Sequence, residues 1–202
     1  ESVYYFKMAS DLGEPKAMAQ YGSMLLKGEG VAKNINEGLK FIKASADNGF
    51  DIAMYNYGLQ LYNGILIPMN KKEAAYYYKM AADKGNAGAS HNYGCMLLNG
   101  DGIPKNIKEA ARYFKFAADH DDSESMFNYG KLLIGSDEIK RDVEGGLKYL
   151  RKAIEKGNVK GYYGIGLYYY CYEKNLKEAF KYFKMSADHG LALGFFMCGV
   201  VL

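Results

Sequence analysis

The sequence contains few cysteines, and their arrangement excludes the architectures that depend on them. Only Cys95, Cys171 and Cys198 occur within 202 residues, and there is no Asn-x-Ser/Thr glycosylation signal. An odd number of cysteines without regular spacing fits neither a disulfide framework nor a zinc motif. We therefore expect reduced thiols, which favours a cytoplasmic location, and we predict neither a metal nor a cofactor.

The sequence also lacks a large excess of charge and a long apolar run. The formal net charge is +3, from 26 basic and 23 acidic residues, so the composition does not indicate binding to nucleic acid or to a membrane surface. No apolar run approaches the roughly 20 residues that span a bilayer. Glu1 and Leu202 both fall inside helical patterns, so we expect this chain to be a piece of a longer protein.

No catalytic constellation is recognisable. There is no Ser-His-Asp arrangement, and Gly28-x-Gly30 lacks the Lys-Ser/Thr of a phosphate-binding loop. His91 and Cys95 are four residues apart and could both contact a metal ion, but no third ligand accompanies them. We therefore predict that the protein is not an enzyme.

What the sequence does contain is one unit repeated along its whole length. Tyr-Gly pairs recur every 36 residues, at Tyr21-Gly22, Tyr57-Gly58, Tyr93-Gly94 and Tyr129-Gly130. A fixed period of this size indicates a single repeat array, in which similar units stack on one another. We place the units at 1–16 (half a repeat), 17–52, 53–88, 89–124, 125–160, 161–193 (shortened by three residues) and 194–202 (the start of another repeat).

Each unit carries the signals of two helices joined by a loop. The apolar residues Ala53, Tyr57 and Leu61 share one face of the predicted first helix. Glycines such as Gly100 and Gly102 then supply backbone angles that other residues resist, which indicates a loop.

Capping signals bound the second helix. Asn70, Asn106 and Asp142 stand at its N-cap, and the two asparagines are followed three residues later by a glutamate, as in a capping box. A terminal glycine closes the second helix in most units. Asp121 replaces that glycine in 89–124, so we expect a weaker cap there.

Glycines inside the predicted first helices indicate close packing. The six are Gly22, Gly58, Gly94, Gly130, Gly166 and Gly199. Glycine within a helix costs about 1 kcal/mol relative to alanine, so we expect a neighbouring helix to approach closely at each one. The small pairs Ser45-Ala46, Ala81-Ala82 and Ala117-Ala118 of the second helices are predicted to form the matching surface.

These features resemble the Sel-one-like repeat family, a subclass of tetratricopeptide-like α/α repeats. The resemblance rests on the Ala-x-x-x-Tyr-Gly helix, on the loops Gly28-Glu29-Gly30-Val31 and Gly100-Asp101-Gly102-Ile103, and on the Tyr-Tyr/Phe-x-x-Ala-Ala-Asp-x-Gly run. It implies an all-α fold, a right-handed α/α superhelical solenoid of helix-turn-helix repeats. It also implies a scaffold or adaptor that assembles other proteins. A secreted branch of the family has paired cysteines in each repeat, which this chain lacks.

In stacked helix pairs the first helices line the concave side, so the residues opposite their packing face form a candidate binding surface. The third position of each repeat places there Tyr55, His91, Phe127 and Tyr163. The fourth position adds Asn56, Asn92 and Asn128, and the seventh adds Leu59, Cys95 and Lys131. The asparagines could bond the main chain of an extended partner peptide while the aromatic side chains hold its side chains. Alternatively, the asparagines only solvate the groove or bond within the helices.

A second interpretation is that the chain is a structural spacer or a dimerisation arm of a longer protein, and that the activity of that protein lies outside this segment. Repeat arrays need polar caps at their ends, and both ends of this chain are apolar, at Tyr4, Tyr5, Phe6, Phe195, Phe196, Val200 and Val201. End-to-end self-association is therefore possible.

Overall fold

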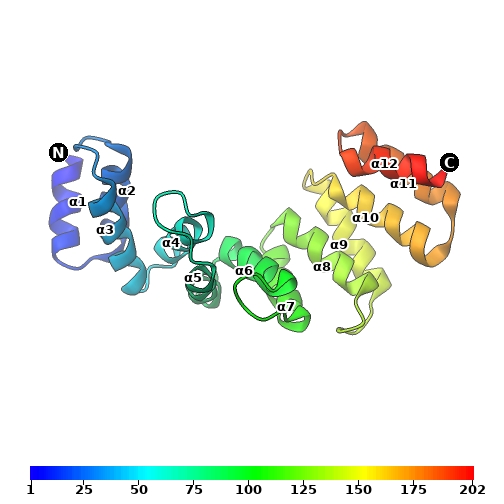
Figure 1. Ribbon diagram of the computed structural model, residues 1–202, viewed down its shortest axis with the longest axis horizontal. Helices are drawn as coiled ribbons and strands as arrows, with labels where there is room; N and C mark the ends of the chain where they lie inside the picture. The colour runs from blue at the N-terminus through cyan, green and yellow to red at the C-terminus, as the bar shows by residue number, and fades with distance from the viewer. The chain divides into compact units, whose positions relative to one another are not determined.

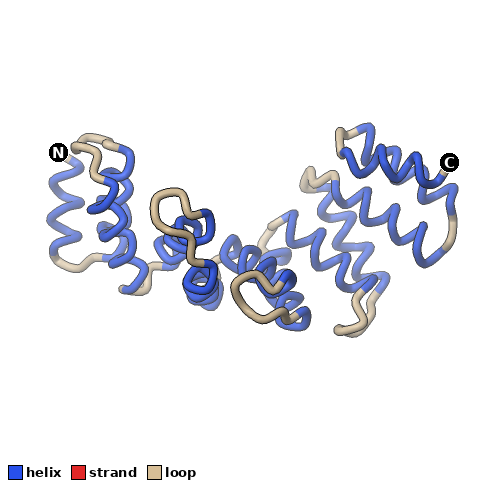
Figure 2. Tube along the Cα trace, viewed as in Figure 1, coloured by secondary structure: helices blue, strands red, loops and turns tan.

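The chain folds entirely into helices and short connections (Figure 1, Figure 2). The computed structural model describes residues 1–202 and contains twelve α-helices, one π-helical turn and no strand. The predicted all-α class is confirmed. None of the helices combines the length with the apolar character that a bilayer-crossing segment requires.

The chain divides into two compact units, Glu1–Asn106 and Ile107–Leu202. The first contains α1 (Ser2–Asp11), α2 (Pro15–Lys27), α3 (Ile35–Asp47), α4 (Asp51–Asn63), α5 (Lys71–Asp83) and α6 (Ala87–Asn99). The second contains α7 (Ile107–Asp119), α8 (Ser123–Gly135), α9 (Val143–Glu155), α10 (Lys160–Tyr168), the π-helical turn η1 (Tyr169–Glu173), α11 (Leu176–Asp188) and α12 (Ala192–Val201). Within each unit every helix packs on the next one along the chain, as in an α/α repeat solenoid.

Side-chain caps start the second helices as predicted. Asn70 Oδ1 accepts the N–H of Glu73 at 3.1 Å, and Asp142 Oδ1 accepts that of Gly145 at 2.9 Å. The box around Asn70 differs from the expected form, because the Glu73 carboxylate accepts from the Asn70 side-chain amide at 2.9 Å. The Asn70 backbone N–H instead donates to the carbonyl of Leu61 in α4 at 2.9 Å. The cap therefore also ties α5 to α4.

The residues that follow the ends of these second helices have a left-handed backbone conformation. The angle φ is 92°, 92°, 82° and 86° at Gly49, Gly85, Gly157 and Gly190. Asp121 adopts the same conformation at φ 67°, where a Cβ is sterically disfavoured. The weaker cap that the sequence predicts at this position would therefore come from the unfavourable backbone conformation of Asp121. An ion pair with Lys156 at 2.8 Å is too exposed to offset much of it.

In two repeats the paired helices meet backbone to backbone at glycines. A Cβ on Gly22 would lie 2.8 Å from the carbonyl oxygen of Gly38, and a Cβ on Gly38 would lie 2.8 Å from that of Gly22. Gly130 and Gly146 repeat the arrangement with the same two distances. The crossings of α2 with α3 and of α8 with α9 are therefore possible only because these residues have no side chain.

In two other repeats an aromatic ring fills the space beside the mid-helix glycine. A Cβ on Gly58 would lie 2.9 Å from the ring of Tyr78, and one on Gly166 would lie 2.6 Å from the ring of Phe183. The carbonyl oxygen of Ala74, which occupies the repeat position of Gly38, is 3.5 Å from the Cβ position of Gly58. Helices α4 and α5 are thus farther apart at this point, and the ring of Tyr78 fills the difference.

Two residues of the second helix vary together with these contacts. Glycine is followed four positions later by an aliphatic side chain, and alanine by an aromatic one: Gly38 with Ile42, Gly146 with Leu150, Ala74 with Tyr78, and Ala179 with Phe183. Where glycine lets the two helices approach closely, a smaller aliphatic side chain fills the space between them. Where alanine keeps them farther apart, a larger aromatic ring fills it, so that the interior is densely packed in both cases. These four repeats therefore share one helix crossing, with either a glycine and an aliphatic residue or an alanine and an aromatic residue on the second helix.

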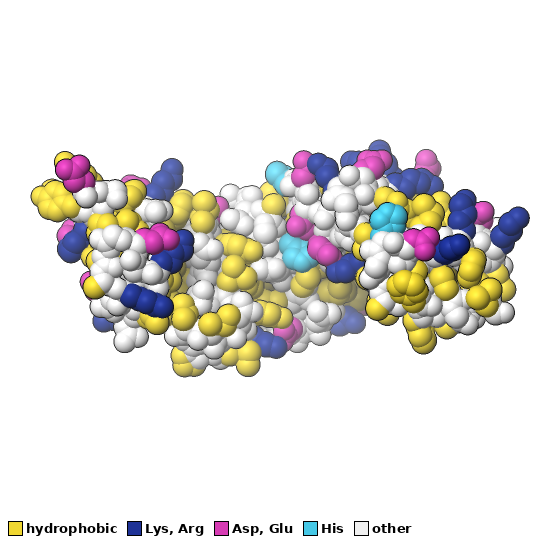
Figure 3. Space-filling view, turned by 90° about the horizontal axis from the view of Figure 1, so that it is seen from above, with side chains coloured by type: hydrophobic (Ala, Val, Ile, Leu, Met, Phe, Trp, Pro, Cys, Tyr) yellow, Lys and Arg dark blue, Asp and Glu magenta, His cyan; other side chains and the backbone are white.

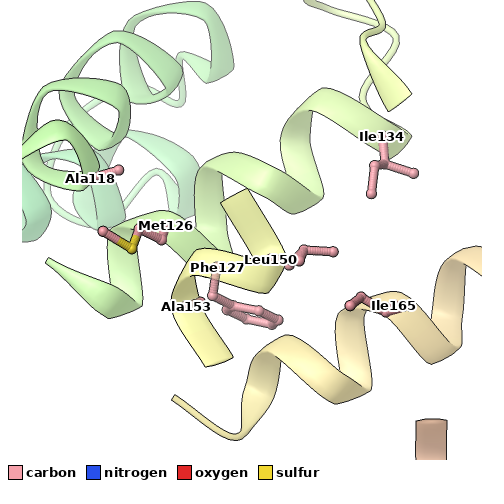
Figure 4. Close-up of a cluster of buried hydrophobic side chains, with 7 residues drawn as sticks. All are labelled: Ala118, Met126, Phe127, Ile134, Leu150, Ala153 and Ile165. Carbon is pink, nitrogen blue, oxygen red and sulfur yellow. The ribbon is translucent and has the colours of Figure 1, made fainter. Parts of the chain in front are cut away.

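The predicted partner surface for the mid-helix glycines is wrong. In two repeats the second residue of the small pair contacts the next first helix along the chain instead, whereas Ser45 donates to the carbonyl oxygen of Pro15 in α2, the first helix of its own repeat, at 2.5 Å. Ala118 of α7 shares a buried cluster with Met126 of α8 (Figure 4), and a Cβ on Gly194 of α12 would lie 2.5 Å from the backbone nitrogen of Ala187. The small second residue of the pair therefore allows consecutive repeats to approach.

In two repeats the acidic residue near the end of the second helix has a structural role. Asp47 accepts bonds from Lys43 Nζ and from the Tyr77 hydroxyl of the next repeat, each at 2.7 Å. The same arrangement recurs with Lys115, Asp119 and Tyr149. Burial would raise the pKa of both carboxyls, but the hydrogen bonds outweigh it and hold each pKa below its ordinary value.

The apolar side chains at the ends of the chain are mostly exposed. Tyr4 and Tyr5 of α1 and Phe195 and Phe196 of α12 are each more than half exposed, and Val200 is exposed as well. Phe6 and Val201 are partly buried. Self-association through these surfaces stays a prediction.

Replacing Gly130 with alanine should lower the free energy of unfolding by about 1–3 kcal/mol, because the new Cβ overpacks the contact between α8 and α9. Gly199→Ala is the matched control. No atom lies within 4 Å of the Cβ position of Gly199, so an added methyl group meets no neighbour there. It should leave stability unchanged or raise it by up to about 1 kcal/mol. Chemical denaturation measures both, and equal losses would contradict the packing explanation.

Ala74→Gly and Tyr78→Leu should compensate each other. Alone, each leaves the crossing of α4 and α5 mismatched, whereas together they reproduce the pairing seen at Gly146 and Leu150. We expect the double variant to be more stable than the sum of the single losses predicts, by about 0.5–3 kcal/mol. A double-mutant cycle in urea gives this coupling energy, and strict additivity would rule out the pairing.

A low pH should weaken the hydrogen bonds that Asp47 and Asp119 accept from a tyrosine of the next second helix. Because the pKa of Asp47 and of Asp119 is depressed in the folded state, their contribution is complete above the ordinary carboxyl pKa, near 4, and is lost as the pH falls below it. Tyr77→Phe with Tyr149→Phe removes one bond to each carboxylate, so stability should fall less steeply between pH 4 and pH 2. Tyr76→Phe, beside Tyr77 but exposed, is the control and should keep the original slope.

Candidate functional site

The residues predicted to bind a partner come from the even-numbered helices, which are the first helices of the repeats. We call the third, fourth and seventh positions of these helices the first-helix face. In the first unit it includes Tyr55, Asn56 and Leu59 on α4 and His91, Asn92 and Cys95 on α6. In the second unit it includes Phe127, Asn128 and Lys131 on α8 and Tyr163 on α10.

Tyr55 is shared between the surface and the packing of the first unit. Its ring centroid is 6.1 Å from that of Tyr78 on α5, and a Cβ on Gly88 of α6 would lie 3.3 Å from the Tyr55 ring. The side chain is partly buried as a result, as is that of Leu59. Tyr55 therefore supports the contact of α4, α5 and α6 and offers only part of its ring to a ligand.

The asparagines have different surroundings. Asn56 is exposed, and it lines a hollow of about 660 Å³ together with Ala19, Gln20 and Ser23 of α2. Asn92 hydrogen-bonds the hydroxyl of Tyr78, a side chain that is 1% exposed and needs such a partner. Burial raises the pKa of Tyr78. Asn92 thus has one structural bond and further donor and acceptor capacity.

His91 and Cys95 lie together on α6. The Cys95 Sγ is 3.5 Å from the His91 Nε2, the distance expected for a side-chain contact one helical turn apart. No group of three or more histidine, cysteine or acidic side chains comes together anywhere in the chain. All three cysteines are free thiols.

In the second unit Phe127 lies deeper than the sequence suggests. It is 8% exposed and belongs to a cluster with Leu150, Ala153 and Ile165 (Figure 4). Tyr163 is partly buried, with its ring centroid 5.9 Å from that of Phe183. The third position therefore contributes mainly to the core here, because helix α10 contacts both α8 and α9.

A pocket of about 310 Å³ lies on the first-helix face of the second unit, between α8, α10 and η1. Its lining consists of Lys131, Leu132, Ile134, Gly135, Ser136, Gly164, Leu167, Tyr168, Cys171 and Tyr172. Lys131 was predicted for this face, and Gly164 and Leu167 occupy its fourth and seventh positions in the next repeat. The structure thus brings residues of the first-helix face from two neighbouring repeats, 125–160 and 161–193, together around this pocket.

Gly164 makes room for this pocket. The fourth position carries asparagine in the three preceding repeats but glycine here. A Cβ on Gly164 would lie 2.8 Å from Leu150 and 3.4 Å from Phe127, so any side chain would strike the core. The missing amide therefore leaves a depression where the other repeats present a polar group.

The π-helical turn forms the far wall of the pocket, and sequence analysis missed its role. Repeat 161–193 is three residues short, and the chain compensates by widening the end of α10 into η1. The turn ends at Lys174, which has φ of 55°, and Asn175 donates back to the carbonyl of Tyr169 at 3.0 Å. The deletion itself was the available signal, because widened turns of this kind often mark functional sites. It brings Cys171 and Tyr172 to the pocket.

The position of Tyr172 is held from two sides. Its hydroxyl lies where a Cβ on Gly135 would approach to 2.8 Å, so only glycine at 135 leaves room for it. The Arg141 guanidinium lies 4.6 Å from the centroid of the Tyr172 ring, a favourable cation–π distance. Beyond Tyr172 a smaller hollow of about 210 Å³ includes Asp137 and Arg141.

Lys131 is the only charged residue in the lining of the 310 Å³ pocket. Its end reaches solvent, yet burial of the side chain lowers the pKa of the ammonium. The Nζ lies 5.2 Å from the centroid of the Phe127 ring, and no carboxylate lies within ion-pair distance. The pocket therefore combines an apolar floor with an uncompensated positive charge.

The surface in general carries both signs of charge. On the face seen in Figure 3, lysine and arginine side chains are interspersed with aspartate and glutamate, and hydrophobic side chains lie among them. Four lysines are in i,i+4 pairs with an acid: Lys7, Lys43, Lys79 and Lys115. Lys131 differs from them in having no such partner.

The sequence matches one protein family over most of its length. Residues 1–14, 15–50, 51–86, 87–122, 123–158 and 159–191 each match the Sel1 repeat. These boundaries fall two residues before the ones that we place from the Tyr-Gly period. Among curated proteins, a search finds no match.

Solved structures with the same fold include two from bacteria. A protective antigen of uropathogenic Escherichia coli displaying an SLR fold aligns with 98% of this chain at 22% identity, with a TM-score of 0.89. The chain spans 44% of the length of that protein. A Sel1 repeat protein from Oxalobacter formigenes aligns over 94% of this chain and 79% of its own length at 24% identity, with a TM-score of 0.71. At these identities the likeness shows the fold alone, an all-helical repeat solenoid.

Proposed function

Because the chain belongs to the Sel1 repeat family, we propose that it is a non-catalytic scaffold that binds an extended segment of a partner protein on its first-helix face. Sel1 repeat proteins are generally scaffolds for protein interactions. The observation that carries the finer proposal is the pocket at Lys131, Gly164 and Leu167, which is a hollow on the predicted face. The proposal assigns no catalytic residue, metal or cofactor.

The amides of the fourth position provide the main-chain contacts. The side chains of Asn56 (exposed) and Asn128 (partly buried) make no hydrogen bond within the protein, so both amides are available to a ligand. Each offers two donors and an acceptor, which matches the alternating groups of an extended main chain. Asn92 contributes its remaining capacity while it holds the Tyr78 hydroxyl. The asparagine column therefore has both roles that the sequence left open, at different positions.

The other residues divide into contacts and supports. Leu59, His91, Cys95 and Lys131 are at least partly accessible and form the contacts in this proposal. Tyr55, Phe127 and Tyr163 pack against neighbouring helices and hold the face in place. A ligand thus meets polar groups at the fourth position and apolar or charged groups at the seventh.

The test is a selection of random 12-residue peptides on the whole chain, followed by affinity measurements with the strongest binder. Asn56→Ala should weaken peptides that bind the first unit, and Asn128→Ala those that bind the second, each by about fivefold, because a lost hydrogen bond is worth about 1 kcal/mol. Asn36→Ala is the control, since Asn36 is exposed on α3, a second helix, and so lies off the first-helix face. Its affinity should be unchanged.

Two results would contradict the proposal. Selected peptides whose affinity is insensitive to both substitutions would place binding on another surface. Failure to select any peptide, together with dimers in light scattering that disappear on Phe195→Ser and Phe196→Ser, would favour the spacer or dimerisation arm instead.

A further inference from the structure

The pocket at Lys131 has a chemical preference that the face as a whole does not have. Its floor and walls are formed by Leu132, Ile134, Leu167 and the two tyrosines of η1 and α10, and no acidic side chain lines it. Apolar lining with a few placed polar groups is typical of a specific binding site. The single positive charge at its edge indicates which polar group a ligand would bring.

The groups around Lys131 leave its charge uncompensated. The Tyr168 hydroxyl donates to the Glu173 carboxylate, so that acid is already engaged. Arg141 lies across Tyr172, and Asp137 belongs to the hollow beyond it. The Phe127 ring, 5.2 Å from Nζ, orients the ammonium but does not neutralise it. A ligand anion would be the first carboxylate to reach it.

We propose that this pocket binds an apolar side chain of an extended partner segment, and that an aspartate or glutamate next to that side chain pairs with Lys131. The proposal rests on the proposed function and specifies the ligand of one part of the same face. Charge complementarity argues for the acid, and the apolar lining argues for its neighbour. Burial depresses the pKa of Lys131. A bound anion offsets this depression, since the opposite charge favours the protonated amine.

The size of the pocket favours a segment of a protein over a free small molecule. Small-molecule sites commonly enclose about 300–1,000 Å³, and this pocket, at about 310 Å³, is at the lower limit. It holds one large side chain and leaves the rest of the ligand outside. The neighbouring amide of Asn128 is then available to the main chain of that segment.

Cys171 provides a direct readout of occupancy, because it is exposed and lines the pocket. The experiment measures its rate of alkylation by iodoacetamide in the intact chain, by mass spectrometry, with Cys95 and Cys198 as internal references. The probes are two blocked dipeptides that differ only in charge, N-acetyl-Phe-Asp amide and N-acetyl-Phe-Asn amide. N-acetyl-Phe, which has a terminal carboxylate, is the third probe.

We expect N-acetyl-Phe-Asp amide to protect Cys171 selectively, and at about tenfold lower concentration than N-acetyl-Phe-Asn amide, as a charge-assisted bond predicts. Lys131→Gln should remove the difference between the two probes. Lys148→Gln, an exposed lysine of α9, should preserve it. Circular dichroism establishes that both variants keep their helices.

Several results would overturn the inference. Equal protection by the two dipeptides would show that the charge of Lys131 is not used, and no protection by any probe would show that the pocket is not a binding site. Protection by N-acetyl-Phe alone would assign the site to a chain terminus. None of these results affects the test with Asn56 and Asn128, so failure here and failure of the proposed function are distinguishable.

Discussion

The structure depends on the close approach of the two helices of a repeat at a mid-helix glycine, seen in four repeats. At Gly22 and Gly130 the two backbones meet because the facing residue is also glycine, whereas at Gly58 and Gly166 an aromatic ring packs against the glycine. Each such glycine costs about 1 kcal/mol of helix propensity, which the dispersion contacts across the crossing offset. Because the crossing recurs, its geometry fixes which residues of each first helix face the core and which face the surface.

The same crossing explains the variation among repeats. Where the second helix carries alanine instead of glycine, as at Ala74, the helices are farther apart and an aromatic ring fills the space. That ring can bring a hydroxyl into the interior, and the Tyr78 hydroxyl then requires Asn92 from the next first helix. A change in packing within one repeat thus assigns a structural task to a surface residue in the following one.

The candidate site lies where the chain departs from its own repeat. The asparagine column ends at Gly164, the loop of repeat 161–193 is replaced by the π-helical turn, and Lys131 has no acidic partner. Two of these departures remove something that other repeats have, an amide and a loop, and the third adds a lysine where the other repeats have an uncharged residue. Together they leave a hollow with one charge, and regularity elsewhere keeps the surrounding helices in place.

The sequence alone determined the all-α repeat fold, the N-caps at Asn70 and Asp142 and the close packing at four mid-helix glycines, because these depend on local propensity and a fixed period. Only the tertiary structure decided what each glycine touches, that Phe127 lies in the core, and that Cys171 and Tyr172 meet Lys131. Periodicity shows the face of a helix on which a residue lies. It does not show the tilt of the next helix or the path of a shortened turn, which depend on side-chain volumes from several repeats packed at once.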